Sequence, residues 1–145
     1  EEANRDRLYI KIHCKDETWK TSDWLNRHRT QEVKPTKWGE LTPALIQLTK
    51  EALEEGPDVH RFVFICGATI PLQTFDHIYK ALFADDTAWV EPMKVDRHLS
   101  SHLKHKHQLW RAFNRTVAEA FVYHDHYERY RKMIEEKKMP WNLIT

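Results

Sequence analysis

Two groups of side chains in this sequence have the types and spacing of chemically active sites. Asp85 and Asp86 are adjacent carboxylates, and carboxylate oxygens are the ligands that hard divalent cations prefer. The block from Lys94 to Arg115 has six basic residues against Asp96 alone, a net charge of +5, with four histidines interleaved. A block of this kind can bind the phosphates of a ligand or an acidic partner.

Neither group requires a metal or a nucleic acid. Asp85 and Asp86 follow a helical pattern rather than a buried strand, so a solvated turn at a helix end explains them. His98 and His102 would share one helix face, but no Cys or carboxylate nearby completes a ligand set. No nucleic-acid-binding module accompanies the basic charge, so a solvated surface is the simplest interpretation. We predict no metal site and no nucleic-acid partner.

The composition is that of one domain spanning residues 1–145. Twenty-three basic residues against twenty-two acidic ones give a net charge of +1, so no overall field favours nucleic acid or an anionic membrane. No apolar run reaches the roughly 18 residues of a transmembrane helix, and no targeting signal is visible at the start. Any membrane attachment is therefore expected through a segment outside this chain. Cys14 and Cys66 form no redox or metal motif and are expected to be buried thiols.

The elements that must position a site follow from the apolar pattern around residues 61–83. The unbroken apolar run Phe62–Cys66 predicts a strand buried on both faces of a parallel sheet. After Gly67 and Pro71, Thr74 can cap a helix that carries its apolar residues on one face. Ligands of open α/β sheets bind beyond the carboxyl ends of the strands, so residues 66–72 are expected to form part of a cleft floor.

The rest of the chain predicts further strands and helices of an α/β fold, an open and mostly parallel sheet with flanking helices. We expect an outer strand within 5–14 and a short helix within 15–34, with Ser22 and Asp23 as possible caps. A second helix is expected to be capped by Thr42, with Pro43 at its first position, and to stop at Gly56. A short strand at 87–90 and one long helix from the capping box Thr116–Glu119 to about Lys138 should follow.

The segment Ile65–Leu72, with the sequence ICGATIPL, resembles the core-2/I-branching glycosyltransferase family, which includes peptide O-xylosyltransferases and plant relatives. In that family a buried strand runs into Leu-Cys-Gly or Leu-Ser-Glu, then two residues, an apolar residue and Pro-Ile/Leu. Trp38-Gly39 lies before the preceding helix, as in the family. Leu109–Arg115 is similar to the family's Gln-Trp-Phe-X-Leu-X-Arg strand. The resemblance extends from about Leu8 to Arg131.

This resemblance implies a partial GT-A-like, Rossmann-like domain and an inverting glycosyltransferase of the Golgi lumen. Such an enzyme moves a sugar from a nucleotide sugar, expected to be UDP-linked, to a hydroxyl of a glycan or protein. The core-2 branch works without a metal, so no cofactor beyond the donor is expected. The cleft that binds the donor would be built from Trp38, Gly39, Cys66, Gly67, Thr69 and Trp110.

The sequence departs from the family at two positions. The family's catalytic base is a Glu in a Pro-Asp-Glu motif. In residues 140–145 of this chain, Asn142 stands at the position that corresponds to this Glu. An amide cannot take the proton of the acceptor hydroxyl. Thr69 replaces the Asp that core-2 members place two residues before Pro. Catalytic residues therefore stay unassigned. The alternative is a catalytically inactive, truncated relative that serves as a structural or accessory subunit with protein partners.

Overall fold

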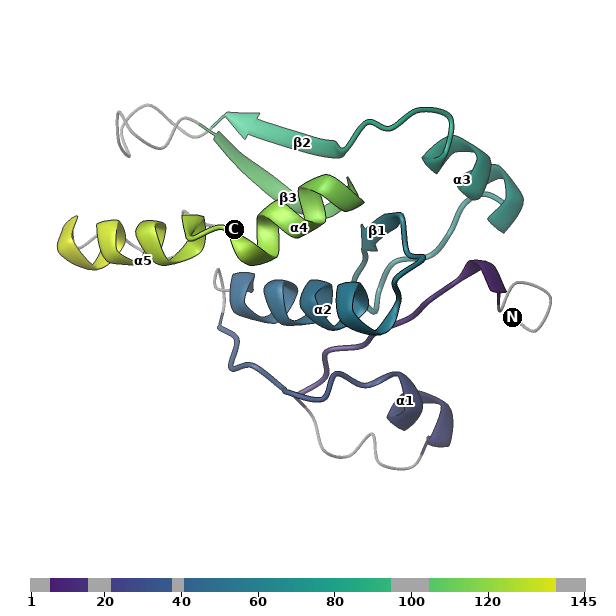
Figure 1. Cartoon of the computed structure of the whole chain (residues 1–145), viewed down its shortest axis with the longest axis horizontal. Helices are drawn as coiled ribbons and strands as arrows, with labels where there is room; N and C mark the ends of the chain where they lie inside the picture. Colours follow the sequence, from purple (N-terminus) through teal and green to yellow (C-terminus); the bar gives the residue numbers. More distant parts are fainter. Residues whose placement is uncertain (1–5, 16–21, 38–40, 95–104, 138–145) are drawn as a thin grey trace.

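The computed structural model describes residues 6–15, 22–37, 41–94 and 105–137 (Figure 1). These residues form both helices and strands. In order they are α1 (Asp23–His28), α2 (Thr42–Glu55), β1 (Arg61–Phe64), α3 (Phe75–Leu82), β2 (Trp89–Lys94), β3 (His105–Asn114), α4 (Arg115–Tyr123) and α5 (His126–Lys137).

The three strands form an antiparallel sheet with the order β1-β3-β2, so the predicted mostly parallel sheet is wrong. Phe64 pairs with Arg111 on one side of β3, and Trp89 pairs with Ala112 on the other. Because β1 and β2 both run antiparallel to β3, they run in the same direction as each other. The unit β1–α3–β2 is thus a crossover whose two strands are separated by β3. An apolar strand pattern indicates burial, but it does not say which strand is the neighbour.

The expectation that β1 is buried on both faces is also wrong. Phe62 and Phe64 are buried, whereas Val63 between them is 49% exposed and Ile65 beyond them is exposed as well. The buried face packs against α2 and α4, which lie next to each other (Figure 1). The buried core cluster consists of Leu45, Ala52, Leu53, Phe62, Phe64, Phe113 and Ala118. On the opposite face of the sheet Val63, Trp89 and Trp110 are exposed.

Local signals for helix ends are mostly confirmed. The Ser22 hydroxyl accepts a hydrogen bond from the Leu25 amide (3.4 Å) at the start of α1, and the Thr74 hydroxyl accepts one from His77 (3.3 Å) at the start of α3. α2 has Pro in its first turn and Gly56 at its C-cap, but the prediction that Thr42 caps it is wrong, because Thr42 is its first residue and the N-cap Leu41 makes no side-chain hydrogen bond. A Cβ at position 56 would lie 2.6 Å from Cγ2 of Val59, so this close approach requires glycine.

The predicted long C-terminal helix is instead two helices. The N-cap of α4 is Asn114, two residues before the predicted cap Thr116, and its side chain accepts a hydrogen bond from the Val117 amide (2.8 Å). His124 has extended backbone dihedrals that end α4, and α5 projects away from the rest of the molecule (Figure 1). The apolar pattern continues across this break, so periodicity alone could not locate it.

The short strand predicted at 87–90 extends further than expected. β2 continues through Pro92, which pairs with His107 after a register shift that follows Val90. Proline lacks an amide donor, but an edge strand with an irregularity tolerates it. β2 is such an edge strand, because it pairs with β3 alone among the strands of the described residues.

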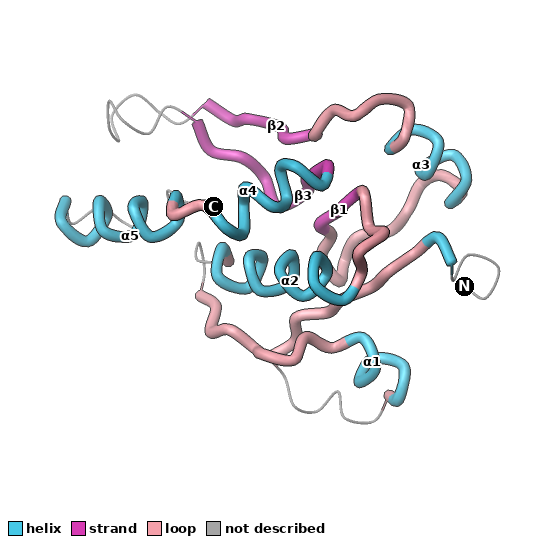
Figure 2. The backbone as a smooth tube through the Cα atoms, in the orientation of Figure 1, coloured by secondary structure: helices cyan, strands magenta, loops and turns pink. Residues whose placement is uncertain are grey.

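The predicted N-terminal strand is reduced to one parallel bridge between Ile12 and Arg29. The Ile12 amide donates to the His28 carbonyl (2.7 Å), and the Thr30 amide donates to the Ile12 carbonyl (2.9 Å). Figure 2 draws both segments as loops, on the side of α2 away from the sheet. Their attachment to α2 therefore depends on side chains rather than on a sheet.

Glu51 of α2 holds these two segments. Glu51 is only 3% exposed. Its carboxylate accepts hydrogen bonds from the Thr30 hydroxyl, the Gln31 amide (3.0 Å) and Gln47 Nε2 (2.9 Å). Lys11 Nζ lies 3.1 Å from its second oxygen. Burial alone would raise the pKa of Glu51, but the hydrogen bonds from Gln47, Thr30, Gln31 and Lys11 outweigh it and lower the pKa to about 2.

We expect acid to destabilise the fold through Glu51. Its pKa is about 2 in the folded chain against 4.5 for a free side chain. The stabilisation is therefore fully present above pH 4.5 and is lost as the pH falls through 2. At about 1.4 kcal/mol per pKa unit, the loss in free energy of unfolding is about 3 kcal/mol. Urea unfolding at a series of pH values measures it, and Glu51→Gln should flatten the dependence. An equal slope in both proteins would contradict this assignment.

Candidate functional site

A tight turn follows β1 at Cys66–Thr69, where the sequence predicts a cleft floor. The Thr69 amide donates to the Cys66 carbonyl (2.9 Å), and the Thr69 hydroxyl accepts from the Cys66 amide (3.1 Å). A Cβ added at Gly67 would meet nothing within 4 Å, so the outer side of the turn is open. A ligand can therefore approach the main chain at Gly67 closely.

Trp110 of β3 reaches this turn from the neighbouring strand. Its indole Nε1 donates to the Thr69 hydroxyl oxygen at 3.1 Å. The register explains why, because Ala112 lies opposite Val63, and Trp110 is on the same face two residues before Ala112. The structure thus brings together Cys66, Thr69 and Trp110, with Gly67 in the same turn. The donor-binding role of these residues stays a prediction, and Trp38 and Gly39 lie outside the described residues.

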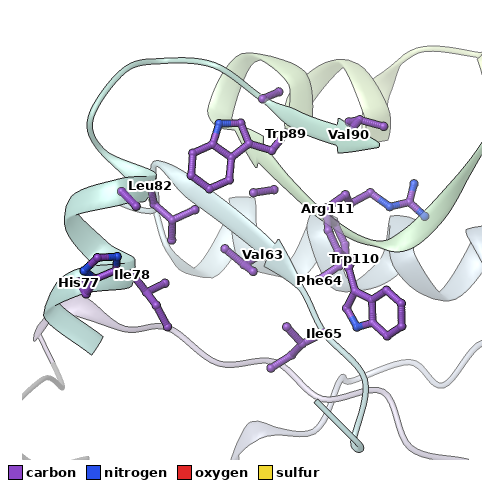
Figure 3. A pocket seen from close by; sticks show the side chains of 13 residues that line it. Val63, Phe64, Ile65, His77, Ile78, Leu82, Trp89, Val90, Trp110 and Arg111 are labelled. Carbon is purple, nitrogen blue, oxygen red and sulfur yellow. The ribbon is translucent and has the colours of Figure 1, made fainter. Parts of the chain in front are cut away.

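Beside the turn, an open groove of about 790 Å³ runs between α3 and the exposed face of the sheet. Its walls are mostly apolar and come from all three strands and α3: Val63, Ile65, Ile78, Leu82, Trp89 and Trp110. Figure 3 shows the indole rings of Trp89 and Trp110 on either side of Val63, with His77 at the edge formed by α3. The sequence pattern did not predict this groove, because the unbroken apolar run of residues 62–66 indicated burial of both faces of β1.

The surroundings of two titratable residues near the groove, Cys66 and Arg111, lower their pKa values. The Thr69 hydroxyl, helped by the Ala68 amide, lowers the pKa of the Cys66 thiol. Burial lowers the pKa of Arg111 to about 10, and its guanidinium lies 5.7 Å from the centre of the Phe64 ring. Cys14 and Cys66 were expected to be buried, but both thiols are half-buried because each lies in a loop rather than inside a strand.

Asp85 and Asp86 have structural partners. The Asp85 carboxylate accepts a hydrogen bond from the Thr87 amide (2.8 Å). Hydrogen bonds from the Thr87 side chain and amide lower the pKa of Asp85. Asp86 Oδ1 lies 3.4 Å from Arg61 Nη1, and the Asp86 carbonyl accepts from Asn114 Nδ2 (2.7 Å). Within the described residues, no three His, Cys, Asp or Glu side chains are grouped so that they could hold a metal ion. His98 and His102 of the basic block lie outside those residues, as does Asn142.

The residues of the Leu109–Arg115 motif serve separate purposes. Phe113 is buried in the core, whereas Trp110 is 54% exposed at the groove. Arg115 Nη1 donates to the carbonyls of Pro57 (2.9 Å) and Val59 (3.0 Å), which lie just before β1. The motif therefore aligns β1 against β3 and presents the indole on the opposite face from the core.

Comparison with known proteins gives a match at the level of a protein family. None of the curated proteins matches the chain, and none of the solved structures does. Within the part of the chain that the structure describes, no helix has the length and apolar character needed to cross a membrane. The protein family described as Core-2/I-Branching enzyme matches residues 3–141. A match over nearly the whole chain, together with the motifs around Cys66 and Trp110, shows that this chain belongs to the core-2/I-branching enzyme family.

Proposed function

We propose that this chain binds a UDP-linked sugar and transfers the sugar, with inversion, to a hydroxyl of a glycan or protein. The observation that carries the proposal is the family match over residues 3–141. The joining of Cys66, Thr69 and Trp110 at the end of β1 supports it, because the motif residues meet at one place. The proposal includes a GT-A-like architecture, independence of metal and a Golgi location.

The reaction makes two demands on a protein. A carboxylate must take the proton of the acceptor hydroxyl, and cations must stabilise the charge on the departing diphosphate. The described part of the chain supplies the surface that would receive the donor: the open side of the turn at Gly67 and the exposed ring of Trp110. The family resemblance adds Trp38 and Gly39, which lie outside the described residues, to the residues proposed to bind the donor.

A second function is favoured by one specific observation. The sequence has Asn142 at the position that corresponds to the catalytic Glu of the family. A relative without its base would keep the fold and serve as an accessory subunit. In that case protein partners, rather than an acceptor hydroxyl, would meet the open face of the sheet.

Calorimetric titration of the purified chain with UDP and several UDP-sugars separates the two functions. We expect binding that is unchanged by manganese at moderate salt. Gly67→Leu should weaken this binding at least tenfold, about 1.4 kcal/mol, because its Cβ enters the open space on the outer side of the turn, where the donor would approach. Thr116→Leu, which introduces the same side chain at an exposed position of α4, should leave affinity unchanged.

Thermal unfolding of both variants checks that the fold is intact. If the folded wild-type chain binds neither UDP nor any UDP-sugar, transfer by this chain is excluded and the accessory function is favoured. Binding followed by sugar transfer to oligosaccharide or peptide hydroxyls would establish the enzyme.

A further inference from the structure

The Thr69 hydroxyl makes an unusually complete set of contacts. A hydroxyl oxygen can accept two hydrogen bonds and donate one. Here it accepts from the Cys66 amide (3.1 Å) and from Trp110 Nε1 (3.1 Å), which uses both acceptor positions. Cys66 Sγ lies 3.3 Å away, so the hydroxyl proton is directed to the sulfur. One oxygen therefore joins the turn after β1 to a side chain of β3.

This contact fixes the indole of Trp110. The ring is attached to β3 through its backbone and to the turn through Nε1, so two points on different segments hold it. The ring remains 54% exposed beside Val63 and Ile65. Because its only hydrogen-bond donor is already used, the indole can offer a ligand nothing but its apolar ring surface. A pyranose ring, which has an apolar face of C–H groups and polar edges, fits such a surface.

We propose that Thr69 is a positioning residue, which holds the Trp110 indole so that the ring face receives the sugar of the bound ligand. The choice of ligand rests on the proposed function above, whereas the attachment of the indole to Thr69 does not. Thr69→Val keeps the size and branching of the side chain but removes the hydroxyl, and Thr69→Ser keeps the hydroxyl. This pair of variants separates the hydrogen bond from packing.

Nuclear magnetic resonance of the ¹⁵N-tryptophan-labelled chain tests the attachment. Each of the six tryptophans gives one indole N–H signal, and the signal lost in Trp110→Phe identifies Trp110. Thr69→Val should shift the Trp110 signal and speed its exchange with solvent at least tenfold, while Thr69→Ser preserves both. The other five signals should stay in place. An unmoved Trp110 signal in Thr69→Val, or an equal shift in Thr69→Ser, would overturn the proposal.

Two further measurements keep the test decisive. If Thr69→Val does not fold, exchange in the wild-type chain is sufficient, because a Trp110 N–H that exchanges as fast as free indole rules out the bond. Titration with UDP-glucose and UDP-N-acetylglucosamine then tests the ligand. We expect the sugar to shift the Trp110 signal and Thr69→Val to bind about tenfold more weakly, with Thr69→Ser restoring affinity.

The two proposals fail in different ways. Absence of any nucleotide-sugar binding by the wild-type chain would remove the proposed function, while the exchange data still decide whether Thr69 fixes the indole. Equal affinities of wild type and Thr69→Val, or a sugar that shifts other tryptophan signals but not that of Trp110, would overturn the positioning role in a protein that does bind.

Discussion

Replacing Glu51 with alanine is expected to lower the free energy of unfolding by about 3–5 kcal/mol, the usual cost of removing one member of a buried ion pair. The substitution leaves the Gln31 amide and the Thr30 hydroxyl without their buried acceptor. Lys11 keeps its contact with Glu55, whose Oε2 lies 2.8 Å from Lys11 Nζ. The segments around Ile12 and Thr30, which form no sheet, should detach from α2 first.

Urea unfolding monitored by tryptophan fluorescence gives the free energy directly. Glu54→Ala is the matched control, because Glu54 is on the same helix but is exposed, and its oxygen lies 3.9 Å from the exposed Lys50. This control should change stability by less than about 0.5 kcal/mol. Similar losses in the two variants would show that the buried contacts of Glu51 do not account for its contribution to stability.

Phe113→Ala is expected to lower the free energy of unfolding by a similar amount, about 3–5 kcal/mol, because it removes a large aromatic side chain from the core. Phe113 is 5% exposed, and its ring centre lies 5.2 Å from that of Phe64 and 5.5 Å from that of Phe121. The three rings join β1, β3 and α4, so the cavity would form where all three elements meet. Thermal and urea unfolding measure the loss.

Tyr123→Ala provides the comparison, since Tyr123 is an aromatic residue of α4 that is 63% exposed. It should cost less than about 1 kcal/mol. If the two substitutions destabilise the chain equally, the aromatic core of the sheet is not where the stability resides. Trp110→Phe should also change the free energy of unfolding little. Trp110 lies on the opposite face of β3 from Phe113, and the variant loses an exposed hydrogen bond to Thr69.

Buried contacts thus hold one face of the sheet, while the residues proposed to bind ligand are on the other. β3 carries both kinds, with Phe113 in the core and Trp110 at the groove. Substitutions at Thr69 or Gly67 can therefore test function with little effect on folding. Substitutions at Phe113 would lose any activity through unfolding, which is why they cannot identify a site.

The sequence by itself determined the features that depend on neighbours within a few residues. Ser22, Thr74 and Gly56 define helix ends because their bonds reach only three or four residues along the chain. The motifs around Cys66 and Trp110 also identified the family, which the match over residues 3–141 confirms.

Only the tertiary structure decided how the strands pair and which residues meet. The antiparallel register of Phe64 with Arg111, the exposure of Val63 and the groove next to α3 depend on contacts between segments distant in sequence. Sequence placed Thr69 and Trp110 in one predicted site only by resemblance. That the Trp110 indole donates to Thr69 follows from β1 and β3 being neighbours, a pairing that apolar periodicity cannot encode because many strands would bury their apolar faces equally well.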